Sequence, residues 1–68
     1  MNQNYQIPIW KKYSLTVEEA AAYFHIGENK IRKIIGDNQD ADYLLWNGNR
    51  PLIKRDMFEK YLNACTLI

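Results

Sequence analysis

The sequence predicts a small α+β domain in which a helix-turn-helix is followed by a two-stranded hairpin and a closing helix. Two apolar stripes at helical spacing flank a short turn that contains glycine, which is typical of a helix-turn-helix. Between residues 43 and 54 the pattern changes to that of two strands joined by an Asn-Gly-Asn tip. A last helical stripe follows at Phe58, Tyr61 and Leu62.

Length and composition restrict what this domain can be. The chain has 68 residues and a mass of 8.1 kDa, so we expect one domain over residues 1–68 and exclude most classes of enzyme. One cysteine and one histidine cannot supply an intrachain disulfide or a four-ligand zinc site. The chain contains no apolar run long enough to span a membrane and no signal-peptide pattern. We therefore expect a cytoplasmic protein without a metal or cofactor.

The first helix is predicted to begin after Thr16 and to end near Phe24. Glu19 lies three residues after Thr16, and this spacing forms a capping box, in which each side chain accepts a hydrogen bond from the other residue's backbone N–H. The helix then carries an apolar stripe made of Val17, Ala20, Ala21 and Phe24.

The second helix is predicted to follow the turn at residues 25–27 and to stop at Gly36. Its core face consists of Ile31, Ile34 and Ile35. At about 100° per residue, the opposite face is polar and mostly cationic. Asn29 and Lys33 point most directly away from the core, Lys30 and Arg32 flank them, and Glu28 lies nearer the core at the positive end of the helix dipole.

The register of the hairpin is predicted from the position of its proline. A two-residue loop at Asn47-Gly48 would place Pro51 at a hydrogen-bonded site, which proline cannot serve because it lacks an N–H. A tip at Gly48-Asn49 instead pairs Trp46 with Pro51 at a non-hydrogen-bonded site. This register puts Leu44, Trp46, Pro51 and Ile53 on one face, and Arg50, Leu52 and Lys54 on the other.

The two ends of the chain are expected to be less regular. Residues 1–13 are predicted to form an extended arm, because Pro8 interrupts a short apolar segment that packs on the body through Ile7, Ile9 and Trp10. The last helix is predicted to start near Arg55, where the sequence offers no good N-cap. Residues 63–68 are expected to form a fraying tail.

The basic residues are clustered although the net charge is only +1. Six of the nine lie in two short segments, Lys30, Arg32 and Lys33 in one and Arg50, Lys54 and Arg55 in the other. Such clustering produces a local positive potential that would attract a phosphate backbone. The alternative is that both clusters are ordinary solvated surface.

This order of elements is that of a small winged helix, with the hairpin as the wing. Three segments, Ile7-Pro-Ile-Trp, Ile26-Gly-Glu-Asn-Lys and Asn47-Gly-Asn-Arg, resemble the excisionases of conjugative transposons, and the resemblance covers nearly the whole chain. The chain is more loosely similar to phage excisionases and to the DNA-binding domain of MerR-type regulators. The family resemblance implies a recombination directionality factor that binds repeated sites in the arms of an attachment region, distorts the DNA and assists a tyrosine-family integrase.

The resemblance also implies which residues bind DNA. In the family the second helix enters the major groove, and the wing contacts the neighbouring minor groove or its phosphates. Carried over by position, these roles fall on Glu28, Asn29, Lys30, Arg32 and Lys33 in the helix and on Asn47, Asn49 and Arg50 in the wing. Lys11, Lys12, Lys54 and Arg55 are further candidate phosphate contacts, although a solvated pair is the favoured interpretation of Lys11 and Lys12.

The remaining chemistry-bearing residues have simpler interpretations. We expect both tryptophans, Trp10 and Trp46, in the core, because their neighbours are apolar. His25 is interpreted as a turn residue, and no serine, cysteine or aspartate is placed to form a catalytic triad with it.

The sequence thus predicts a non-enzymatic, sequence-specific protein that binds and bends duplex DNA during integrase-mediated excision. It is expected to be monomeric in solution and to bind repeated DNA sites cooperatively. Two alternatives stay open at this point. One is a small winged-helix transcriptional regulator, and the other is an adaptor that binds a protein and not DNA.

Overall fold

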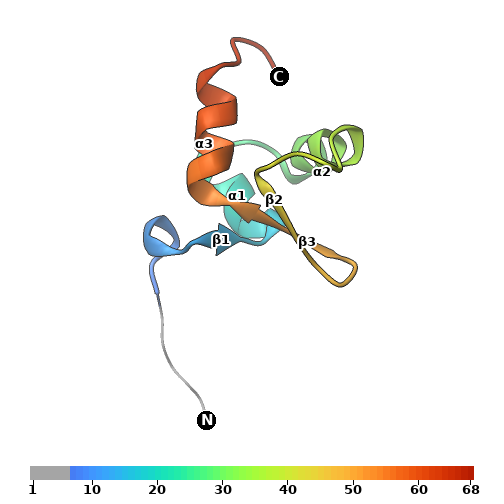
Figure 1. Cartoon of the computed structure of the whole chain (residues 1–68). Helices are drawn as coiled ribbons and strands as arrows, with labels where there is room; N and C mark the ends of the chain where they lie inside the picture. Colours follow the sequence, from blue (N-terminus) through green and yellow to red (C-terminus); the bar gives the residue numbers. More distant parts are fainter. Residues whose placement is uncertain (1–6) are drawn as a thin grey trace.

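Three α-helices, one short 3-10 helix and a three-stranded antiparallel sheet make up residues 7–68, the part of the chain that the computed structural model describes (Figure 1). In chain order the elements are η1 (Ile9–Lys11), β1 (Ser14–Leu15), α1 (Val17–Phe24), α2 (Glu28–Asp37), β2 (Leu44–Asn47), β3 (Arg50–Lys54) and α3 (Arg55–Asn63). The predicted α+β winged-helix arrangement is confirmed, with the β2–β3 hairpin as the wing. No helix in the described part of the chain is both long and apolar enough to cross a membrane.

The wing has the register that its proline predicts. Trp46 pairs with Pro51, and Asn47 pairs with Arg50 at the end of the hairpin. Gly48 has a φ of +66°, a left-handed conformation that suits glycine in a tight turn. The Lys54 N–H donates to the Tyr43 carbonyl at 2.7 Å, so these two residues form a hydrogen-bonded pair. Hydrogen-bonded and non-hydrogen-bonded pairs alternate along an antiparallel hairpin, and the Trp46–Pro51 pair is therefore non-hydrogen-bonded.

The sheet contains a third strand that the sequence did not predict. Ser14 pairs with Lys54 and Leu15 pairs with Ile53, which gives the strand order β1-β3-β2. A two-residue strand is too short to show an alternating pattern, and its pairing is decided by β3. The same edge explains how α3 begins without a side-chain cap, because the Arg55 N–H donates to the Tyr13 carbonyl at 3.1 Å.

The core lies where α1, α2, α3 and the sheet meet. Its buried members are Leu15, Val17, Ala20, Ile31, Ile34, Ile35, Tyr43, Leu44, Ile53 and Phe58. The three isoleucines of α2 are all buried, as predicted. Phe58 is fully buried, and its ring packs edge-on against Phe24 and Tyr43 with centroid separations of 5.1 and 4.9 Å. This packing fixes which side of α2 faces away from the domain.

The predicted start of α1 is confirmed, whereas the predicted ends of α2 and α3 differ from the observed ones. Thr16 and Glu19 form the predicted capping box at the start of α1. The prediction that α2 stops at Gly36 is wrong, because the helix continues to Asp37. The Asn38 side-chain amide donates to the Ile34 carbonyl at 2.8 Å and satisfies an acceptor at this helix end, so glycine is not needed there. The expected tail also begins later, since Asn63 is still helical.

The predictions for the arm and the tryptophans also need correction. The arm is not fully extended, because Ile9–Lys11 form a 3-10 helix, while its first residues, 1–6, lie outside the described part. Trp10 is 62% exposed and Trp46 is 43% exposed, so neither is a core residue. Of the apolar residues predicted to anchor the arm, Ile9 packs against the core and Ile7 is 54% exposed.

Candidate nucleic-acid interface

The polar face of α2 points away from the domain. Because Ile31, Ile34 and Ile35 are buried against the core, the helical period turns the predicted contact residues outward. All five of them are exposed, namely Glu28, Asn29, Lys30, Arg32 and Lys33. The helix therefore presents one neutral amide, three cations and one carboxylate on a surface whose orientation is set by the core.

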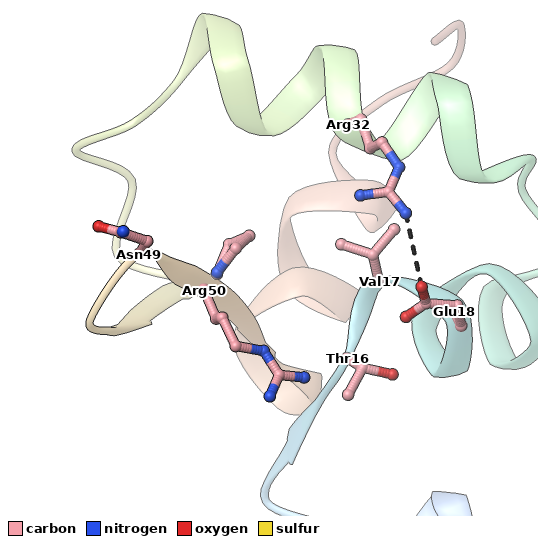
Figure 2. A pocket seen from close by; sticks show the side chains of 7 residues that line it. Thr16, Val17, Glu18, Arg32, Asn49 and Arg50 are labelled. Atoms are coloured by element: carbon pink, nitrogen blue, oxygen red, sulfur yellow. Dashed lines mark hydrogen bonds and ion pairs between the residues drawn. The ribbon is translucent and has the colours of Figure 1, made fainter.

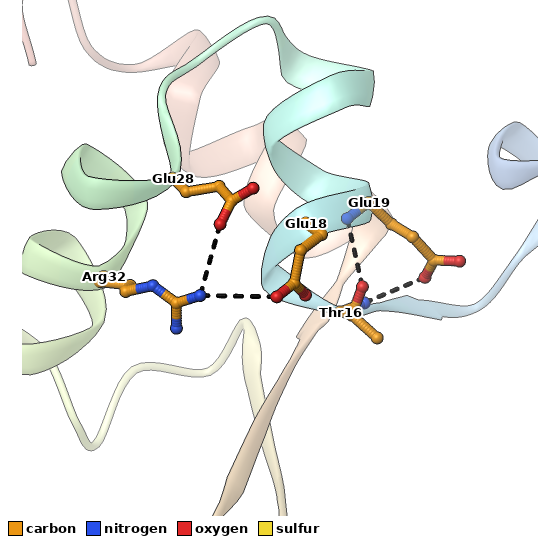
Figure 3. A network of polar contacts seen from close by, with 5 residues as sticks. All are labelled: Thr16, Glu18, Glu19, Glu28 and Arg32. Atoms are coloured by element: carbon orange, nitrogen blue, oxygen red, sulfur yellow. Dashed lines mark hydrogen bonds and ion pairs between the residues drawn. The ribbon is translucent and has the colours of Figure 1, made fainter.

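The cations of this face have weak partners. Arg32 reaches Glu28 at 3.4 Å and Glu18 of α1 at 3.5 Å (Figure 3), and Lys33 reaches Asp37 at 3.2 Å. The Arg32 side chain is 53% exposed and that of Lys33 is 70% exposed. Ion pairs this exposed contribute roughly 0–1 kcal/mol each, so a phosphate could replace the carboxylates at little cost. The Lys30 ammonium donates to the Ile68 carbonyl at 3.3 Å.

The wing brings its polar tip to the same side of the molecule as α2. Asn47, Asn49 and Arg50 are exposed at the tip. Figure 1 shows α2 and the wing tip together on one side of the domain, with η1 on the other. Helix α2 and the wing tip, which carry the predicted contact residues, therefore lie on one side of the domain.

An open groove separates α2 from the wing. It consists of two adjoining pockets of about 200 and 320 Å³, which share Val17, Arg32, Asn49 and Pro51. The lining comes from the start of α1 (Thr16, Val17, Glu18), from α2 (Arg32, Ile35, Gly36), from the following loop (Gln39) and from the wing (Trp46, Asn49, Arg50, Pro51). Figure 2 shows Arg32 extending from α2 toward Glu18, with Asn49 and Arg50 on the wing side. We call this surface the α2–wing groove.

Comparisons with known proteins identify the family of this chain. Residues 1–68 match the family model described as the excisionase from transposon Tn916. The chain belongs to the Tn916 excisionase family. A curated protein from Streptococcus agalactiae serotype V, described as "Excisionase from transposon Tn916", is 52% identical over 62 residues, which cover 91% of this chain and 92% of that protein. The family resemblance found in the sequence is confirmed, and membership makes this an excision-promoting recombination protein.

In this member of the excisionase family, the four additional phosphate candidates lie apart from the α2–wing groove, and none of them lines it. Lys11 is exposed on η1, and Lys54 is half-buried at the end of β3. Lys12 forms an ion pair with Glu19, and this hydrogen bond holds the pKa of the Glu19 carboxyl below its ordinary value despite partial burial. Lys11 is thus the most accessible of these candidates.

Arg55, the fourth candidate, is engaged inside the domain. Its side chain is only 19% exposed, and its Nε donates to the Lys12 carbonyl at 3.0 Å. Its guanidinium also contacts Asp56 at 2.9 Å and lies 6.0 Å from the centre of the Tyr23 ring. These contacts tie α3 to the arm and to α1, which favours a structural role for Arg55 in this excisionase.

Sequence reasoning missed several residues of the groove. The sequence predicts Thr16 only as a helix cap, assigns no role to Glu18, and predicts Trp46 in the core. Gln39 lies in an irregular connection that carries no periodic signal. The predicted strand register was the one signal for the exposure of Trp46, because it places this residue near the hairpin tip, beyond the core.

Among residues 7–68 there is no group of three or more His, Cys, Asp or Glu side chains that could hold a metal ion. His25 has a φ of 60°, and its backbone N–H donates to the Ala21 carbonyl at the end of α1, so its interpretation as a turn residue is confirmed.

Proposed function

We propose that this excisionase family member binds and bends duplex DNA in the arms of an element's attachment region and assists a tyrosine-family integrase in excision. In this proposal α2 enters the major groove through Glu28, Asn29, Lys30, Arg32 and Lys33, while Asn47, Asn49 and Arg50 of the wing contact the adjacent minor groove or its phosphates. The protein acts in the cytoplasm as a monomer that binds repeated sites cooperatively. The observation that carries the proposal is the shared placement of an exposed cationic helix face and a polar wing tip on one side of the domain.

The charges of this surface favour a polyanion as partner. Within residues 7–68, the ion-pair partners of Arg32 and Lys33 are exposed carboxylates, and a bidentate arginine–phosphate contact is stronger than such ion pairs. Asn29 carries a donor and an acceptor that can hydrogen-bond an adenine edge, which provides about 1–3 kcal/mol of discrimination between bases. Phosphate contacts would thus supply most of the affinity, and Asn29 would supply part of the specificity.

The test is DNA binding at several salt concentrations, measured with duplexes from the ends of the element that carries the gene. With about six phosphate contacts, log affinity should fall with log salt at a slope near −5. Lys33→Ala and Arg50→Ala should weaken binding to all duplexes and reduce the slope by about 1 each, while Asn29→Ala should mainly reduce specificity. Lys60→Ala is the matched control, because Lys60 is an exposed cation on α3 that does not line the groove.

A salt slope shallower than about −2, with all three variants binding like the wild type, would refute DNA binding through this surface and favour the protein adaptor. Bending is tested by placing one site at the centre or at the end of a fragment, since only a bent complex migrates differently in the two positions. An excision assay with the integrase distinguishes the excisionase from a transcriptional regulator, because a regulator would bind DNA without raising the yield of excised product.

A further inference from the structure

Trp46 is the exposed aromatic residue of the wing. It lies on β2 opposite Pro51, is 43% exposed and lines the α2–wing groove. Its indole Nε1 donates to the Gln39 carbonyl at 3.2 Å, so the ring is held in one orientation. Large exposed aromatic rings in fixed positions are typical of binding surfaces, where they provide contact area at low entropic cost.

The groove beside Trp46 combines an apolar floor with a net positive charge. Val17 and Ile35 contribute apolar side chains, and Gly36 contributes bare helix backbone. Its charged lining residues are Arg32 and Arg50 against the single carboxylate of Glu18. Because Arg32 already contacts Glu18, a phosphate that entered would meet a partly neutralised acid and two guanidinium groups.

We infer that the α2–wing groove seats one sugar–phosphate strand of the bound duplex, with the Trp46 ring against a deoxyribose at one end and with Arg32 and Arg50 on phosphates farther along the groove. This inference rests on the proposed function and names the part of DNA that this groove binds. A ligand in which apolar sugars alternate with anionic phosphates matches a groove that has an aromatic ring at one end, an apolar floor, and two cations toward the other end. A strand seated here also passes between α2 and the wing, so the two elements engage grooves on either side of one backbone.

Gly36 provides a way to block the groove without removing any charge. A Cβ atom added at Gly36 would meet no atom within 4 Å, and the residue is helical and exposed. Gly36→Ala should therefore fold normally and melt at a temperature no lower than that of the wild type. Gly36→Met should also fold, but its longer side chain should extend into the groove and exclude the DNA strand.

The experiment uses Trp46 itself as the reporter. The chain has two tryptophans, so Trp10→Phe leaves Trp46 as the only one. The probe is a labelled duplex of arbitrary sequence, about two helical turns long, at low salt, because backbone contacts do not depend on sequence. Anisotropy of the label measures binding, and tryptophan emission measures the surroundings of Trp46. Emission should change in parallel with anisotropy, and Gly36→Met should bind at least about tenfold more weakly than Gly36→Ala.

The outcomes separate this inference from the proposed function. If the duplex binds but Trp46 emission stays constant, or if Gly36→Met binds as tightly as Gly36→Ala, the strand does not lie in the groove, while DNA binding itself stands. If the wild-type protein produces no anisotropy change at low salt, DNA binding is refuted and this inference with it. Circular dichroism of each variant shows whether a loss of binding reflects unfolding.

Discussion

Replacing Thr16 with alanine removes one half of the capping box that starts α1. The Thr16 hydroxyl accepts a hydrogen bond from the Glu19 N–H at 3.1 Å, and the Glu19 carboxylate accepts one from the Thr16 N–H at 3.0 Å. Loss of an N-cap side chain costs about 1 kcal/mol, within a range of roughly 0.5–2 kcal/mol. In a domain of this size, a loss of about 1 kcal/mol lowers the melting temperature by roughly 4–8 °C.

Thermal and urea unfolding followed by circular dichroism measure this effect. Thr16→Ser is the matched control, because it keeps the hydroxyl that accepts from Glu19. We expect Thr16→Ser to remain within a few tenths of a kcal/mol of the wild type and Thr16→Ala to lose about 1 kcal/mol. Equal stabilities of the two variants would show that the cap does not stabilise α1, and the reasoning from the capping box would then be wrong.

Two further predictions concern ionisable groups. The Lys12 ammonium holds the pKa of Glu19 below its ordinary value of 4.5, so this pair stabilises the fold above about pH 4.5, and the stabilisation is lost as the pH falls through the folded-state pKa. Glu19→Gln should therefore have a lower urea midpoint than the wild type near pH 7 and a similar midpoint in acid. A difference in midpoint that does not depend on pH would contradict this. The Tyr43 hydroxyl is buried without a hydrogen-bond partner among residues 7–68, so Tyr43→Phe should raise the free energy of unfolding by about 1 kcal/mol. Tyr13→Phe is the control, because Tyr13 is exposed and its replacement should leave the free energy of unfolding unchanged. If Tyr43→Phe is less stable than the wild type, the hydroxyl has a partner, such as a buried water.

The predicted parts of the fold are those that depend on local geometry. The capping box and the three isoleucines of α2 follow from fixed spacings along a helix, and the structure confirms both. The wing register follows from one covalent fact, the missing N–H of Pro51, which excludes the alternative pairing. These features needed no knowledge of distant contacts, so the outward face of α2 was predictable residue by residue.

The parts that were missed depend on distant contacts. Strand β1 exists because β3 offers it an edge, and the start of α3 is satisfied by the Tyr13 carbonyl. The apolar neighbours of Trp46 suggested burial, but the hairpin extends beyond the core and leaves its ring exposed. Likewise, no local pattern shows that Arg55 is engaged with the Lys12 carbonyl, 43 residues earlier in the chain.

The sequence by itself determined the helical periods, the cap of α1, the register of the wing and the side of α2 that carries Asn29 and Lys33. These follow from backbone geometry and from which side chains avoid water. Only the tertiary structure decided that Arg32, Trp46 and Arg50 line one groove, because they lie on separate elements whose relative positions are set by packing around Phe58 and Ile53. Local spacing fixes the direction of a side chain along its own element, whereas the distance between elements is fixed by the shared core.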